Sequence, residues 1–185
     1  MNKKDSILQA ALKLLTSNGL HATPMSAIAK EAGTGMGTIY NYYPTKEVLI
    51  NEIYVDIKQQ EEALFDHFNS ELPTKTQFET YFENTVDFFL QNPLYFKFME
   101  QLHASPIITN DSRTVGRNAV ESVVQLIDSG KNDRIIKNIN TSEILQFVGG
   151  AILSYLRWYL SDNNNQGNSR SLKNLTSMVW DAIKE

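Results

Sequence analysis

The fold is decided by residues 33–49, GTGMGTIYNYYPTKEVL. Gly33 allows a sharp turn, because glycine adopts a left-handed backbone at little cost. Pro44 ends the helical pattern that follows, and Thr45 suits the N-cap of the next helix. The stretch therefore predicts one very short helix, Met36 to Tyr42, between two tight turns.

Two helical patterns precede this stretch. An apolar stripe predicts a first helix over residues 4–17, ended by Asn18 and Gly19. The second is expected to have Thr23 as its N-cap and Pro24 at its first position, and to stop at Gly33. Three short helices with a tight middle turn predict a helix-turn-helix unit, with core residues at Ile28, Ala32, Ile39 and Val48.

The short helix carries small or hydrogen-bonding side chains, a composition suited to the major groove of DNA. Asn41 can pair with adenine, whereas Thr38 and Met36 can contact a thymine methyl group. Tyrosine hydroxyls can reach phosphates, and Lys46 adds a full positive charge at the start of the following helix.

This run, together with ATPMSAIAKEA at residues 22–32, resembles the DNA-binding signature of the TetR-type transcriptional repressors over about residues 5–50. The resemblance implies phosphate contacts from Thr23, Tyr40, Tyr42 and Lys46, and bases near Met36, Gly37, Thr38 and Asn41. The sequence departs from the family where a hydrophobic residue and a serine commonly follow the turn glycine, since Thr34 and Gly35 stand there. Glycine is still an acceptable helix cap. The residues expected to contact DNA are Thr23, Thr34, Gly35, Met36, Gly37, Thr38, Tyr40, Asn41, Tyr42 and Lys46.

Charge is distributed unevenly along the 185 residues, although the net charge is −4. Residues 1–50 hold five lysines and three carboxylates, whereas the remainder holds twelve basic and eighteen acidic residues. An anionic partner is therefore expected at the N-terminal segment. The chain has no cysteine, which excludes disulfides and thiolate chemistry. Gln9 and Lys13 interrupt the first apolar stretch, so a secretory signal is not expected and the protein is predicted to be cytoplasmic.

The remaining sequence predicts further helices and no sheet. They are expected over residues 45–68, 77–90, from 92 onward, 113–127, 141–160 and 170–183. We therefore expect an all-α protein of about nine helices, with a helix-turn-helix DNA-binding domain at residues 1–46. Residues 47–185 are predicted to form a larger antiparallel helical domain for effector binding and dimerisation.

Aromatic residues are concentrated in this larger part, and plain core packing is the commoner role for each of them. More aromatics are present than a small bundle needs, and apolar pockets with a few polar groups bind small ligands. The candidate pocket residues are Phe88, Phe89, Phe96, Met99, His103, Tyr155 and Trp158. No metal site is expected, because the histidines lack ligand spacing, and no cofactor is predicted.

The helix at residues 141–160 is apolar nearly all round, so one face is left for a second subunit. Gly149 and Gly150 allow close approach, and two subunits can form a four-helix bundle with the last helix. The expected dimer residues are Gly149, Gly150, Ile152, Leu153, Leu175 and Val179.

These observations favour a homodimeric, effector-responsive repressor that binds double-stranded operator DNA and does not bind membranes. A helical DNA-binding dimer without a small-molecule effector is the main alternative. A helical protein that no longer binds DNA and an α-helical enzyme are further alternatives; the enzyme is disfavoured because the sequence holds no nucleophile–base pair or carboxylate dyad.

Overall fold

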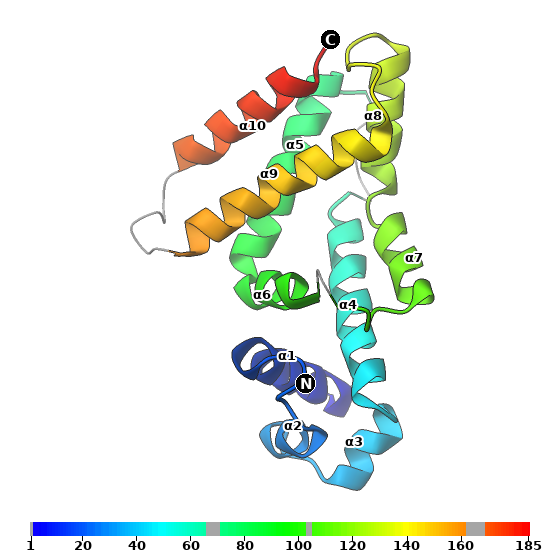
Figure 1. Cartoon of the computed structure of the whole chain (residues 1–185), viewed down its shortest axis with the longest axis vertical. Helices are drawn as coiled ribbons and strands as arrows, with labels where there is room; N and C mark the ends of the chain where they lie inside the picture. The colour runs from blue at the N-terminus through cyan, green and yellow to red at the C-terminus, as the bar shows by residue number, and fades with distance from the viewer. Residues whose placement is uncertain (1, 66–70, 103–104, 162–168) are drawn as a thin grey trace. The chain divides into compact units, whose positions relative to one another are not determined.

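The computed structural model describes residues 2–65, 71–102, 105–161 and 169–185. Within these ranges the chain is helical, and the prediction of an all-α fold is confirmed (Figure 1). The helices are α1 (Lys3–Asn18), α2 (Met25–Glu31), α3 (Met36–Tyr42), α4 (Lys46–Ala63), α5 (Thr74–Gln91), α6 (Pro93–Leu102), α7 (Asn110–Asn118), α8 (Glu121–Asn132), α9 (Thr141–Ser161) and α10 (Ser169–Ile183).

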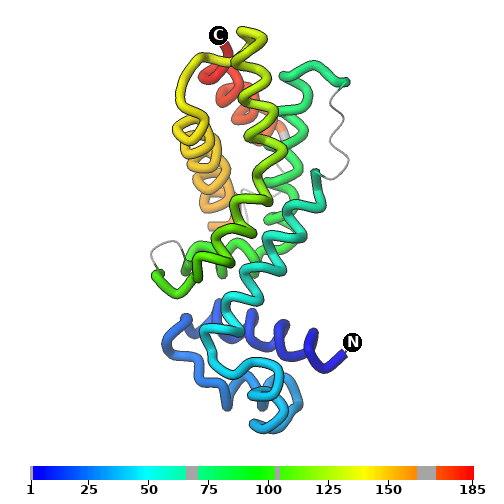
Figure 2. The backbone as a smooth tube through the Cα atoms, turned by 90° about the vertical axis from the view of Figure 1, so that its right-hand side faces the viewer, coloured from blue at the N-terminus to red at the C-terminus, as the bar shows by residue number. Residues whose placement is uncertain are grey.

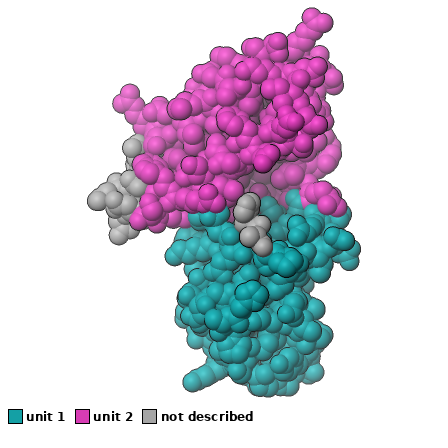
Figure 3. Space-filling model, in the orientation of Figure 1, with its two compact units in different colours: residues 1–60, 92–116 teal, residues 61–91, 117–185 magenta. Residues whose placement is uncertain are grey.

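The chain divides into two compact units (Figure 3). Unit 1 consists of residues 1–60 and 92–116, and unit 2 of residues 61–91 and 117–185. The predicted boundary at residue 46 therefore falls inside unit 1, which also contains α6 and most of α7. None of the described helices combines the length and the low polarity that a membrane span requires.

Unit 1 is built around α1, which packs against α2 and α6. Asn2 caps α1 by accepting a hydrogen bond from the backbone N–H of Asp5 (2.9 Å), and Gly19 ends the helix at φ +92°. The stripe of Ile7, Ala11 and Leu15 is buried, as its helical spacing predicts. Figure 2 follows the short turns that lead from α1 through α2 and α3 into the longer α4.

Unit 2 has α5 at its centre, in contact with α8, α9 and α10. Phe78 and Phe82 of α5 are fully buried, and the ring centroids of Phe78 and Trp180 are 5.5 Å apart. Many of the aromatic residues in this part are therefore core. Burying an aromatic or large aliphatic side chain contributes about 1.5–3 kcal/mol, so this centre stabilises the unit.

Two helices occupy the region where the sequence predicts one over residues 113–127. Helix α7 ends at Asn118 and α8 begins at Glu121, because Val120 leaves helical geometry with φ −110° and ψ 8°. Its N–H is donated to the carbonyl of Arg117 (3.2 Å), a tighter turn than an α-helix makes. The predicted number of about nine helices is therefore low by one within the described ranges.

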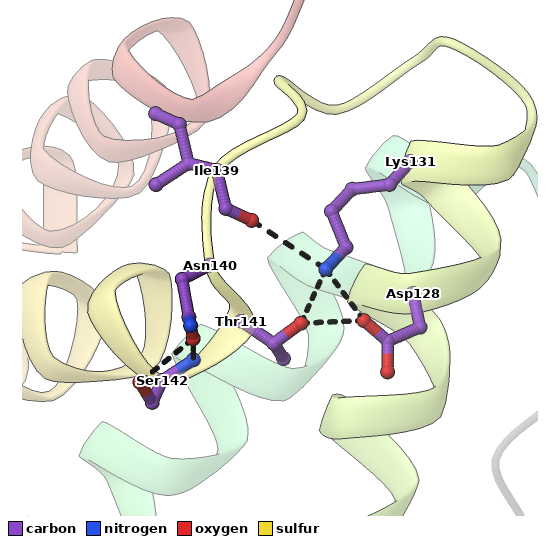
Figure 4. A network of polar contacts seen from close by, with 6 residues as sticks. All are labelled: Asp128, Lys131, Ile139, Asn140, Thr141 and Ser142. Carbon is purple, nitrogen blue, oxygen red and sulfur yellow. Dashed lines mark hydrogen bonds and ion pairs between the residues drawn. The ribbon is translucent and has the colours of Figure 1, made fainter.

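The connection between α8 and α9 is more ordered than its polar sequence suggests. Arg134 adopts a left-handed backbone (φ +58°), and Ile136 is buried and forms an isolated antiparallel bridge with Lys184. Figure 4 shows the side chains that join the end of α8 to the start of α9. Lys131 pairs with Asp128 (2.7 Å) and donates to the hydroxyl of Thr141, which in turn donates to Asp128.

Candidate nucleic-acid interface

The turn between α2 and α3 depends on two glycines. Gly33 has φ +61°, a backbone conformation in which glycine carries no steric cost. The N–H of Thr34 is donated to the carbonyl of Ala29 (2.9 Å), and the Nζ atom of Lys3 to the carbonyl of Gly33 (3.3 Å). Gly35 is the N-cap of α3. Because it stands where a serine is common in the TetR-type repressors, α3 has no side-chain capping hydrogen bond.

Helix α3 has one buried and one exposed side. Ile39 is fully buried, and Tyr43 directly after the helix is 2% exposed. Tyr40 and Tyr42 are each 46% exposed, and Met36 is 39% exposed. The exposed side also carries Gly35, Gly37 and Asn41, while Thr34 and Thr38 are half-buried.

The exposed side of α3 suits an anionic partner. Residues 34–46 contain no aspartate or glutamate, so no carboxylate within this stretch repels a phosphate. The available groups are tyrosine hydroxyls, an amide, a threonine hydroxyl and a thioether. These groups can donate to phosphates, read base edges and contact thymine methyl groups.

Thr23 differs from its predicted role. It is fully buried, and its hydroxyl donates to the carbonyls of Leu14 (3.2 Å) and Gly19 (2.9 Å). Pro24 is the N-cap of α2, so the prediction that Thr23 caps this helix is wrong. The side chain instead fastens the start of α2 to the end of α1, and in this conformation it is shielded from any phosphate.

Lys46 is held close to the same segment. Its Nζ atom donates to the carbonyls of His21 and Thr23, both at 3.2 Å. Thr45 caps α4 as predicted, because its hydroxyl accepts the N–H of Val48 (3.2 Å). The ammonium group of Lys46 therefore joins the start of α4 to the segment that leads into α2.

Val48 corrects one expectation about the core, because it is 45% exposed. It directly precedes Leu49 and Ile50, which are fully buried, so the apolar face of α4 begins one residue later than the sequence suggests. Ala32 is half-buried, whereas Ile28 and Ile39 are fully buried as predicted. Lys3 was not predicted from the sequence; nothing in its neighbourhood signals the contact with Gly33.

The residues predicted to line an effector pocket are divided between the two units. Phe88 and Phe89 are buried in α5 of unit 2, whereas Phe96 is buried in α6 of unit 1. Met99, also in α6, is half-buried. His103 lies outside the described residues.

Tyr155 and Trp158 lie beside an open groove between α9 and α10. The groove has a volume of about 370 Å³ and is lined by Ala151, Ser154, Tyr155, Trp158, Ser171, Asn174, Leu175 and Met178. Trp158 is 42% exposed and Met178 67% exposed, so the groove presents apolar surface to solvent.

The predicted dimer residues occupy different depths on these helices. Ile152 and Val179 are buried within their own chain, and Leu153 and Leu175 are half-buried. A Cβ atom added to Gly149 or Gly150 meets nothing within 4 Å. The exposed Phe147 was not predicted, although it lies on the same helix two residues before Gly149.

A second cavity in unit 2 was also not predicted from the sequence. Its volume is about 660 Å³, and it is lined by Phe65, Leu72, Pro73, Thr74, Gln77, Ser122, Gln125, Leu126, Ser129, Asp133 and Ile135. The lining combines five apolar residues with three hydroxyl groups, two side-chain amides and the carboxylate of Asp133. Its residues come from three separate parts of the sequence, which explains why periodicity alone gave no signal for it.

The fold and the exposed side of α3 define a helix-turn-helix DNA-binding protein with additional helical structure. The family model described as bacterial regulatory proteins, tetR family, matches residues 7–53, and the tetracyclin repressor-like C-terminal domain matches residues 54–185. The chain belongs to the TetR family and is a DNA-binding transcriptional regulator.

Relatives of known sequence support this assignment. The chain is 31% identical over 129 residues to the HTH-type transcriptional regulator YhgD of Bacillus subtilis strain 168, a stretch covering 69% of this chain and 62% of that protein. It is 23% identical over 172 residues to the HTH-type transcriptional repressor KstR2 of Mycolicibacterium smegmatis, covering 85% and 80% of the two chains.

Solved structures share the fold across the whole chain. A TetR family transcription regulator from Shewanella sp. PV-4 has a TM-score of 0.89 at 22% identity and covers all of both chains. A Clostridium perfringens protein described as a fatty acid metabolism regulator has a TM-score of 0.83 at 20% identity, with 96% and 98% of the two chains covered.

Proposed function

We propose that this chain is a homodimeric repressor that binds a pseudo-palindromic operator and is released by a small effector. The observation that carries the DNA-binding part is the exposed side of α3, which lacks carboxylates and presents Tyr40, Asn41 and Tyr42. The repressor role is supported by the relative KstR2, which is described as a transcriptional repressor. The protein then acts in the cytoplasm, where its operator lies.

Within the operator complex, α3 lies in the major groove. Met36 and Thr38 contact thymine methyl groups, and Asn41 makes paired hydrogen bonds with adenine. Tyr40 and Tyr42 donate to phosphates, and the Lys46 ammonium group adds charge there. Thr34, Gly35 and Gly37 let the backbone come close to the bases. Residues 1–46 form the DNA-reading domain, and residues 47–185 provide effector binding and dimerisation.

A homodimer gives the two recognition helices the spacing of successive major grooves, about 34–36 Å. The exposed apolar side chains Phe147, Trp158 and Met178 on α9 and α10 support this interface, because their burial is favourable. Gly149 and Gly150 leave space for close helix approach.

The dimer can be tested with Gly150→Arg, which places a long charged side chain on the proposed interface. Sedimentation should change from dimer to monomer while the helical circular dichroism is retained. Leu94→Arg is the control, because Leu94 is 39% exposed and lies in α6, outside α9 and α10. A monomeric wild-type chain at micromolar concentration contradicts the proposal.

The effector is proposed to be a small, largely hydrophobic or aromatic molecule. The cavity of about 660 Å³ supports this, since pockets of about 300–1,000 Å³ hold ligands of this size. The structural relative described as a fatty acid metabolism regulator makes medium and long acyl chains the first class to test.

The experiment begins with selection of duplexes from a random DNA library by the full-length chain. Fluorescence anisotropy then measures the Kd of the enriched duplex, and a panel of fatty acids and aromatic acids is titrated into the complex. An effector should weaken the complex about 5–150-fold, the usual range for coupling of this kind. Enrichment of a duplex that no compound releases supports the alternative of a DNA-binding dimer without an effector.

Lys46→Ala and Tyr42→Ala test the DNA-contact assignment itself. Both should sharply weaken operator binding, since each removes a proposed phosphate contact. Lys75→Ala is the control, because Lys75 is an exposed lysine of α5 paired with Glu79 (3.7 Å). If Lys46→Ala and Tyr42→Ala bind like the wild type, the chain does not use this surface for DNA.

A further inference from the structure

Asn51 joins α4 to the segment that precedes α7. It is buried, and its Nδ2 atom donates to the carbonyl of Ile107 (2.9 Å). Its Oδ1 atom accepts the backbone N–H of Thr109 (3.0 Å). One amide thus binds a carbonyl and an N–H of the same short segment, two contacts that span 56 and 58 residues of sequence.

Asn51 also bonds its own helix, since Nδ2 donates to the carbonyl of Glu47 (2.9 Å). The side-chain amide of Asn51 therefore makes hydrogen bonds with three main-chain groups, donating to two carbonyls and accepting from one N–H. A buried amide in this position is costly to disrupt, because each group left without a partner loses about 1–3 kcal/mol.

The segment that Asn51 holds is fixed from its other side as well. The Nε atom of Arg113 donates to the carbonyl of Ile108 (3.2 Å), and the Ile108 side chain is buried. The Thr109 hydroxyl accepts the N–H of Ser112 (3.2 Å) and caps the start of α7. Side chains thus bind main-chain groups of three consecutive residues, 107, 108 and 109.

A second contact repeats the same connection one turn along α4. Tyr54 lies three residues after Asn51, and positions three apart share a helix face. A Cβ atom on Gly116 of α7 would lie 2.1 Å from the Tyr54 hydroxyl oxygen, so the two elements are packed closely.

These contacts lie within unit 1, to which the chain returns at residue 92 after forming α5. The same stretch of α4 begins at Lys46, whose ammonium group binds the carbonyl of Thr23 at the start of α2 (3.2 Å). Asn51 lies five positions after Lys46 on the same helix, so the contact with the DNA-reading helices and the contact with residues 107–109 are less than two turns of α4 apart.

We propose that Asn51 is a positioning residue for DNA binding: it holds residues 107–109 on α4 and so sets the operator affinity without touching DNA. The proposal rests on the proposed function. In this proposal the contact of Asn51 with Ile107 and Thr109 is either closed, with both hydrogen bonds made, or open, and the closed form favours DNA binding. By linkage, operator DNA must then stabilise the closed contact.

The test compares the wild type with Asn51→Leu and Asn51→Asp, all as full-length chains. Leucine has a similar size and removes both contacts. Aspartate keeps the acceptor for Thr109 but places an oxygen against the Ile107 carbonyl. Thr109→Ala is the matched control, because it removes the cap of α7 while leaving the backbone N–H that Asn51 binds. The probe is the duplex enriched by the wild-type chain from a random library.

Two readouts are measured, the Kd of the duplex and the hydrogen exchange of the Thr109 amide with and without DNA. In the wild type and in Thr109→Ala, DNA should slow this exchange. Asn51→Leu should raise the Kd about tenfold and abolish the effect of DNA on the exchange. Asn51→Asp should raise the Kd at least as much, because its carboxylate faces the carbonyls of Glu47 and Ile107, and it provides an independent second test.

Unchanged Kd values in the Asn51 variants, or a wild-type Thr109 amide that exchanges equally fast with and without DNA, overturn the proposal. A wild-type chain that enriches no duplex contradicts the proposed function instead.

Discussion

Tyr42 and Tyr43 are adjacent in sequence with ring centroids 6.3 Å apart, yet they face opposite environments. Tyr42 is 46% exposed on the side of α3 that we propose to contact DNA, whereas Tyr43 is 2% exposed and its hydroxyl is buried with no hydrogen-bond partner within the described structure. Phenylalanine substitutions at these two positions therefore separate DNA binding from stability.

Tyr42→Phe should weaken operator binding about tenfold, the loss expected for one hydrogen bond to a charged group. Its thermal stability should be unchanged, because Tyr42 is exposed. Tyr43→Phe should instead stabilise the fold by about 1 kcal/mol, since it removes a buried polar atom that lacks a partner. Fluorescence anisotropy measures operator binding, and urea unfolding measures stability. Weaker operator binding in Tyr43→Phe together with unchanged binding in Tyr42→Phe contradicts the account.

Tyr43 also predicts a stability change at high pH. Burial, and after it the negative charge of Glu52, raises the pKa of Tyr43 to about 12 from the ordinary value of 10.0. The folded state therefore holds this proton more tightly than the unfolded state, so the contribution to stability is present below pH 10 and is lost as the pH rises from 10 towards 12. Urea unfolding across this range should show a smaller loss in Tyr43→Phe than in the wild type. If the free energy of unfolding falls equally steeply with pH in the two chains, Tyr43 does not have this role.

Gly37→Ala distinguishes the free protein from its DNA complex. A Cβ atom at Gly37 meets nothing within 4 Å, and alanine favours a helix over glycine by roughly 1 kcal/mol. The variant should therefore melt at a slightly higher temperature. It should also bind the operator more weakly, because the added methyl group occupies the side of α3 that we propose to approach the bases. Unchanged operator affinity means that Gly37 does not approach the DNA.

Gly130→Ala tests the packing at the end of α8. Gly130 is buried, and a Cβ atom there would lie 2.7 Å from Cδ1 and 2.9 Å from Cγ1 of Ile136. Overpacking of this kind costs about 1–3 kcal/mol, so the midpoint of urea unfolding should fall. Ser129→Ala, at the exposed neighbouring position, is the control and should leave the midpoint nearly unchanged.

Asp128 predicts an acid dependence of stability. Hydrogen bonds from Lys131 and then Thr141 lower the pKa of Asp128 from its ordinary value of 3.8. A lowered pKa in the folded state adds stability above the unfolded value, and this stability is lost as the pH falls through the folded value. Asp128→Asn should therefore lose less stability between neutral pH and pH 3 than the wild type. Thr141→Val removes the hydroxyl that donates to Asp128, so it should also lose less stability over this pH range than the wild type.

The DNA-reading helices were predictable because their signals are local. Gly33, Pro44 and Thr45 fix the turn, the stop and the cap within a few residues of the elements they control. The capping role of Thr23 was wrong because its hydroxyl has a stronger alternative in the carbonyls of Leu14 and Gly19, which only the packed structure brings near.

The second unit was harder to predict, since its features depend on distant residues. The break between α7 and α8 occurs at Val120, which carries no proline or glycine signal. Ile136 lies in a polar connection, yet it is buried through its pairing with Lys184. In unit 1, the contacts of Asn51 with Ile107 and Thr109 also follow from tertiary structure and leave no periodic trace in the sequence.

The most direct test of the account measures how the chain reads each base pair of its enriched duplex. Wild type and Asn41→Ala are compared on duplexes with single base-pair substitutions. The wild type should prefer a pseudo-palindrome, and Asn41→Ala should lose its preference at one equivalent position in each half-site, by about 1–3 kcal/mol. A base preference that is the same in both chains at every position contradicts the claim that α3 reads DNA.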